Sequence, residues 1–105
     1  MTRIGLAAAL LTGCSATNDD CEDFRSGKAG QALRDGIAQS SSDPNAAAAR
    51  LELARRAANG SSGEHFAVLA EAIRDYRTVT LAGRDSAVVA DRLSEAIADV
   101  DAACS

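Results

Sequence analysis

The chain has very few of the residues on which catalytic and cofactor sites depend. It contains one histidine, one proline, no tryptophan and three aromatic side chains among 105 residues. Any catalytic triad or haem site would therefore have to include His65, the only histidine. Acids outnumber bases fifteen to eleven, which argues against nucleic acid as a partner because nucleic-acid binding needs a basic face.

The chain also has no apolar run long enough to cross a membrane. The longest run, residues 4–12, would form a helix of about 14 Å, roughly half the thickness of the hydrocarbon core. It follows the terminal amine and Arg3, and small residues come after it, as in an export signal. The run therefore predicts a signal segment and not a membrane-spanning helix.

Residues 11–14, Leu-Thr-Gly-Cys, resemble the lipobox of bacterial lipoproteins. In that family the cysteine is acylated on its sulfur, and the signal is cut just before it. The resemblance implies a signal peptide over residues 1–13, lipid such as palmitate on Cys14, and a lipidated tether over residues 14–20. The alternative interpretation is a buried apolar helix in a cytosolic protein, with Cys14 an ordinary residue.

The same resemblance implies a location. The protein would be exported and held by Cys14 on the outer face of the cell membrane or the periplasmic side of the envelope. Its abundant alanine and its ten arginines to one lysine are similar to those of small helical actinobacterial lipoproteins. Without residues 1–13 the chain keeps ten basic and fifteen acidic residues, so acyl chains and not charge would attach it to an anionic membrane.

The two remaining cysteines predict a disulfide. If Cys14 carries lipid, Cys21 and Cys104 are left in an oxidising compartment, where such a pair forms a bridge. The chain has no C-x-x-C motif, and two cysteines with one distant histidine do not make a zinc site. We therefore expect a Cys21–Cys104 disulfide, with no metal and no cofactor.

Apolar residues recur at helical spacing in four segments, separated by short polar breaks. The core positions that this spacing predicts include Leu33, Ile37, Leu51, Phe66, Leu69, Ile73, Leu93 and Ile97. This pattern predicts an all-α domain over residues 21–105, folded as an up-down-up-down four-helix bundle with one disulfide. In that order Cys21 and Cys104, with the acids that flank them, meet at one end of the bundle. The expected helices cover about residues 19–40, 44–58, 62–82 and 86–104.

Local signals predict how these helices begin and end. The first helix should kink or form an irregular turn near Gly27, and Asp43 should cap the second helix, which begins with a proline. We expect the Asn-Gly pair at Gly60 to close the second helix in a left-handed turn. Ser61 and Glu64 have the spacing of a capping box for the third helix, and we expect Gly83 to end that helix.

No nucleophile, base and orienting group can be assembled from these segments, so we expect a protein without enzymatic activity. The leading hypothesis is a lipid-anchored cell-envelope protein whose helical domain contacts an envelope or extracellular protein. The alternative is a carrier of haem, metal or a small apolar molecule on the membrane surface. His65 would then supply one axial ligand, because Tyr76 lies about 16 Å further along the same helix and is too far away to share an ion.

Overall fold

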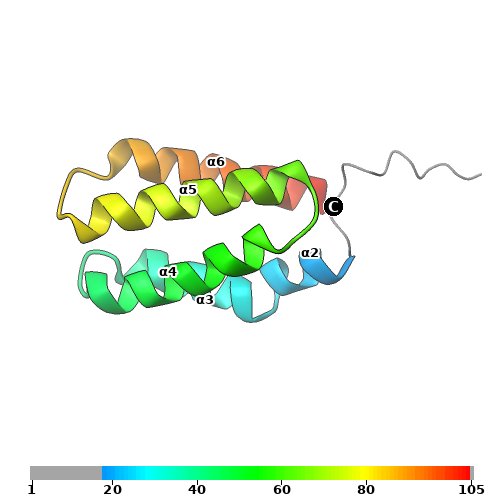
Figure 1. Cartoon of the computed structure of the whole chain (residues 1–105), viewed down its shortest axis with the longest axis horizontal. Coiled ribbons are helices and arrows are strands. Elements are labelled where there is room, and N and C mark those ends of the chain that lie inside the picture. The colour runs from blue at the N-terminus through cyan, green and yellow to red at the C-terminus, as the bar shows by residue number, and fades with distance from the viewer. Residues whose placement is uncertain (1–17, 105) are drawn as a thin grey trace, which may run out of the picture.

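The described part of the chain folds into an all-helical domain, which confirms the prediction that the domain is all-α (Figure 1). The computed structural model describes residues 18–104, and this part of the chain contains no strand. One short helix and four longer ones make up the domain. They are α2 (Asn18–Arg25), α3 (Lys28–Gln39), α4 (Pro44–Asn59), α5 (Glu64–Leu81) and α6 (Ala87–Ala103).

Each of the longer helices packs on the next one along the chain. Helix α3 packs on α4, α4 on α5 and α5 on α6, while α2 contacts both α3 and α6. In Figure 1 the α3–α4 and α5–α6 turns lie at one end of the domain. The α4–α5 turn and the C-terminal end of α6 lie at the other end, beside α2. The short helix thus occupies the place where the first and last parts of the domain meet.

One hydrophobic core joins all five helices, and it is rich in alanine. Small residues allow close packing: a Cβ added to Gly36 in α3 would lie 2.8 Å from the side chain of Leu51 in α4. The rings of Phe24 and Phe66, 5.1 Å apart between centroids, link α2 to α5. The largest fully buried side chains, all at predicted core positions, are Phe66, Leu51, Leu69, Ile73 and Leu93.

The kink predicted near Gly27 is a complete break between α2 and α3. The amides of Ser26 and Gly27 both donate to the carbonyl of Glu22, at 2.9 and 3.0 Å, and these bonds end α2. The chain then turns so tightly that a Cβ on Gly30 would lie 2.5 Å from the Phe24 carbonyl oxygen. This close approach of two backbones requires glycine at position 30.

The start of α4 and the end of α5 follow the predicted signals. Asp43 Oδ1 accepts a hydrogen bond from the Ala46 amide at 3.2 Å, and Pro44 occupies the first helical position. Gly83 has a φ of 69° just after α5, where an L side chain would be strained.

The predicted boundary between α4 and α5 is wrong in two respects. Gly60 has a φ of −87° and not a left-handed conformation. The predicted capping box is absent, because Gly63 is the residue before α5 and the Ser61 hydroxyl donates to the Ala57 carbonyl at 2.8 Å. The positive φ falls at Gly63, at 103°. Between these glycines the Ser62 amide donates to Asp20 of α2 at 2.9 Å, a tertiary contact that the local pattern does not contain.

Candidate functional site

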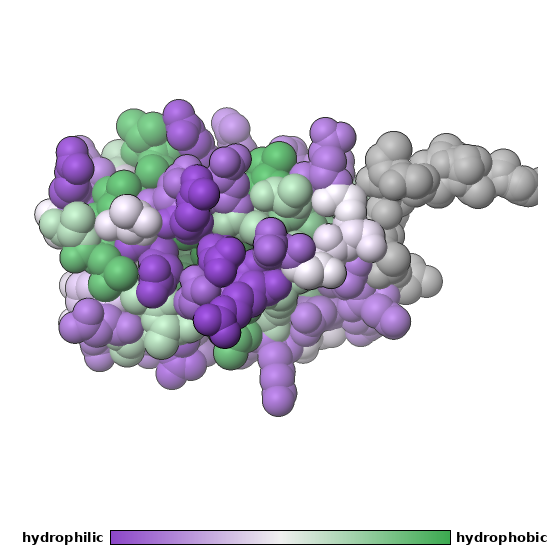
Figure 2. Space-filling view, viewed as in Figure 1, coloured by the Kyte–Doolittle hydropathy of each residue, from purple (hydrophilic) through white to green (hydrophobic). Residues whose placement is uncertain are grey.

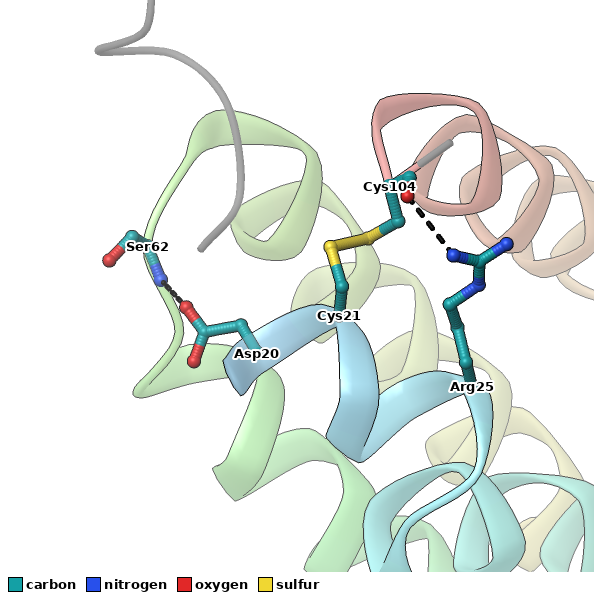
Figure 3. Close-up of a disulfide and its surroundings, with 5 residues drawn as sticks. All are labelled: Asp20, Cys21, Arg25, Ser62 and Cys104. Atoms are coloured by element: carbon teal, nitrogen blue, oxygen red, sulfur yellow. Dashed lines mark hydrogen bonds between the residues drawn. A yellow bond between two sulfur atoms is a disulfide. The ribbon is translucent and has the colours of Figure 1, made fainter. Parts of the chain in front are cut away.

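The most strongly connected part of the surface is the end of the domain where α2 meets α6. Cys21 of α2 and Cys104, which directly follows α6, form a disulfide with a Cα–Cα distance of 5.6 Å (Figure 3). This confirms the predicted pairing. Cys21 is buried and Cys104 is half-buried, so the bridge lies at the edge of the core.

Two hydrogen bonds reinforce this junction. Arg25 Nη1 donates to the Cys104 carbonyl at 3.1 Å, so a cation lies at the C-terminal end of α6 where the helix dipole favours one. On the other side of α2, Asp20 Oδ2 accepts from the Ser62 amide at 2.9 Å. Figure 3 shows α2 held between α6 and the α4–α5 turn by these contacts. Arg25 comes one helical turn after Cys21, so its placement on the same face could have been read from the sequence.

The acidic residues of α2 gather at this end, as predicted, and most have local structural roles. Asp19 and Asp20 lie in the first turn, where the helix dipole favours acids. The Glu22 carboxylate accepts from the Ser26 hydroxyl at 3.4 Å, and the Asp23 carboxylate accepts from the Ala29 amide at 3.5 Å. These local contacts explain why acidic residues occur in α2, so no bound ligand is needed to explain them.

His65, the candidate axial ligand of a carrier, and Tyr76 lie on different turns of α5. His65 is half-buried in the first turn of α5. The buried Tyr76 hydroxyl lies 2.6 Å from the Ser40 hydroxyl, which itself donates to the Ile37 carbonyl. Since the Ser40 hydrogen is used in that second bond, Tyr76 is the donor in the first. Across residues 18–104 no three His, Cys, Asp or Glu side chains are grouped so as to hold a metal ion.

A groove of about 490 Å³ lies between α3 and α6, and the sequence did not predict it. Phe24, Leu33, Ile37 and Ile97 supply its apolar lining. Ile37 and Ile97 were predicted as core positions, but both are only half-buried. The only sign of such a groove in the sequence is that α3 and α6 each place an isoleucine on the predicted core face.

A cluster of charged side chains on α4 is the strongest electrostatic feature of the described residues. Arg55 donates to both Glu52 carboxylate oxygens, at 2.8 and 2.7 Å, and Arg56 donates to one of them at 3.1 Å. The hydrogen bond from Arg55 is the main cause that lowers the pKa of Glu52 to about 2, against an opposing effect of desolvation. The same hydrogen bond raises the pKa of Arg55. All three side chains belong to one helix and pair with one another, so no substrate is needed to explain the cluster.

Comparisons of the chain with protein-family models, with curated proteins and with solved structures find no match. Cys14 and the rest of the lipobox-like motif lie outside the described residues. Among the helices of residues 18–104, none is both long enough and apolar enough to span a membrane.

Proposed function

We propose that this chain is a lipid-anchored, non-enzymatic cell-envelope protein whose up-down-up-down helical domain contacts a protein partner. The observation that carries the proposal is the Cys21–Cys104 disulfide. Disulfides persist in oxidising compartments outside the cytosol, which agrees with export. The bridge also uses two of the three cysteines and leaves Cys14, at the end of the Leu-Thr-Gly-Cys motif, for lipid.

In this proposal the disulfide end of the domain faces the membrane. Helix α2 begins at Asn18, four residues after Cys14 and within the expected tether, and four residues reach at most about 14 Å. This reach exceeds the Debye length of about 8–10 Å at physiological salt, so anionic head groups repel the acidic α2 only when the domain comes closer than that. The lipid would thus hold the domain close to the bilayer, while charge repulsion opposes still closer contact through α2.

The opposite end, with the α3–α4 and α5–α6 turns, would then point away from the membrane. Leu81 and Val88 flank the α5–α6 turn and are 41% and 66% exposed. Figure 2 shows hydrophobic surface gathered toward this end, while hydrophilic side chains cover the middle of the same face. We therefore place the partner contact at the end that carries Leu81 and Val88.

Replacing Cys14 by alanine tests the anchor. The native chain should fractionate with membranes and carry the mass of its acyl chains, whereas Cys14→Ala should be released and lack that mass. Ser15→Ala is the matched control, and it should behave like the native chain. Unchanged fractionation and unchanged mass in Cys14→Ala would contradict the proposal.

A ligand carrier is the second candidate, and only the form that binds a small apolar molecule has an observation in its favour. That observation is the apolar groove between α3 and α6. Among residues 18–104 no geometry supports a haem or metal carrier, since Tyr76 is hydrogen-bonded to Ser40 and His65 lies in the first turn of α5.

A further inference from the structure

The groove between α3 and α6 combines apolar and charged lining residues, as a site for an amphiphile with a single hydrocarbon chain would. Its apolar lining comes from α2, α3 and α6 through Phe24, Leu33, Ile37 and Ile97. Its volume of about 490 Å³ falls within the range of small-molecule sites. Two turns of an α-helix occupy roughly 850 Å³, taking a diameter of about 10 Å, so a partner helix would rest on the rims without filling the groove.

The charge around the groove is opposite in sign to that of the protein. The lining contains two guanidinium groups, Arg25 and Arg34, and one carboxylate, Asp101. The local charge is therefore +1, on a chain whose net charge is −4. Arg25 is oriented by its bond to the Cys104 carbonyl, and Arg34 by a 3.3 Å bond to Gln31 of its own helix. A guanidinium has five N–H donors, and each of these bonds uses one.

From these two features we infer that the groove binds a free fatty acid with a chain of up to about twelve carbons. The hydrocarbon chain lies on the apolar lining, and the carboxylate pairs with Arg34 and Arg25. A carboxylate matches the planar fork of an arginine, whereas a cationic head group would be repelled by the net positive rim. This inference deepens the carrier candidate by naming its ligand class, and it does not depend on lipid at Cys14.

Calorimetric titration with dodecanoate tests the inference. The full chain with Cys14→Ala and an intact disulfide is used, so that no covalent acyl chain competes for the groove. We expect saturable binding of one dodecanoate per chain. Affinity should rise about fourfold for each methylene added from octanoate to dodecanoate, the increment expected for burial of a CH₂ group. Dodecyltrimethylammonium, which has the same chain and the opposite charge, should bind at least tenfold more weakly than dodecanoate.

Two pairs of variants locate the site. Arg34→Glu, on the exposed rim, should weaken dodecanoate binding at least tenfold, whereas Arg84→Glu, an equally exposed change in the α5–α6 turn, should leave it within twofold. Ile97→Asp should abolish binding, and Leu53→Asp, at a half-exposed leucine on α4, should not. Circular dichroism of each variant identifies any that fails to fold. If Ile97→Asp does not fold, the comparison of Arg34→Glu with Arg84→Glu still tests the inference, because both arginines are exposed.

Three results of the binding experiments would overturn the inference. They are the absence of saturable dodecanoate binding, equal affinity for the cationic amphiphile, and equal losses in Arg34→Glu and Arg84→Glu. A dimer in sedimentation equilibrium that Ile97→Asp dissociates would instead assign the groove to a second copy of the chain, and would also refute it. Membrane fractionation reports on Cys14 alone, so a failure here is distinguishable from a failure of the proposed anchor.

Discussion

Replacing Cys21 and Cys104 together by alanine should lower the free energy of unfolding by about 4–5 kcal/mol. The bridge joins residues separated by 83 positions, so it constrains almost the whole described chain in the unfolded state, and the chain-entropy model gives this value for a loop of that length. Small domains have a total stability of roughly 5–15 kcal/mol, so the loss would be a large fraction of the whole. That fraction should be especially large here because much of the buried core is alanine, which buries little apolar surface and so adds little to the total stability.

The assay is thermal and guanidinium unfolding followed by far-UV circular dichroism. For a domain of this size each kcal/mol shifts the melting temperature by about 4–8 °C, which predicts a fall of at least about 16 °C. The native chain treated with a reductant should melt close to the double variant. Alanine is preferred to serine because Cys21 is buried and a hydroxyl there would lack a partner.

Cys14→Ala alone is the control, since it removes a thiol without touching the bridge. Without detergent, the Cys14→Ala chain should have the same melting temperature as the native chain. Reductant should lower the melting temperature of both by the same amount. If the double variant melts with the native chain, or if reduction has no effect, the bridge does not stabilise this fold and the entropic argument fails.

Three further perturbations test the local structure. Gly30→Ala should lower the free energy of unfolding by about 1–3 kcal/mol in chemical unfolding, because the added Cβ would clash with the Phe24 carbonyl. Gly60→Ala is the control and should be neutral or slightly stabilising, because its Cβ would lie 3.5 Å from the nearest atom, the Arg56 carbonyl oxygen. Asp43→Ala should cost about 1 kcal/mol through loss of the α4 cap. The pKa of Glu52 is lowered to about 2 in the folded chain. The contribution of its carboxylate to the free energy of unfolding is therefore complete above about pH 5 and is lost as the pH falls toward 2. Partial exposure limits that contribution to roughly 0.5–1 kcal/mol, and Glu52→Gln should remove it.

The parts of the fold that the sequence predicted correctly are those fixed by short-range chemistry. The helical spacing of apolar residues correctly predicted the core positions of α4 and α5, and the Asp-Pro pair correctly predicted where α4 begins. The α4–α5 turn was predicted wrongly because its geometry depends on residues far away in the chain. The Ser62 amide donates to Asp20, 42 positions earlier, and the positive φ lies at Gly63, the residue next to this contact.

The same division holds for the candidate sites. The disulfide was predictable because the cysteine count and the expected helix order both pointed to one pair. The groove was not predictable, because it depends on the distance between α3 and α6. Helical periodicity indicates which face of a helix is apolar and gives no information on the distance between two helices. Both isoleucines that line it were assigned to the core, because a half-buried position and a buried one look alike in the sequence.

The disulfide and the groove are two consequences of one packing arrangement. The longer helices pack in the order of the chain, so no sequential contact closes the side where α3 faces α6. Helix α2 joins that side at one end only, through the Cys21–Cys104 bridge and the hydrogen bond from Arg25 to Cys104. Because a covalent bond holds the ends together, α3 and α6 do not need to collapse onto each other for the domain to remain folded. The bridge thus allows an apolar groove to persist at the surface of a domain with a small core.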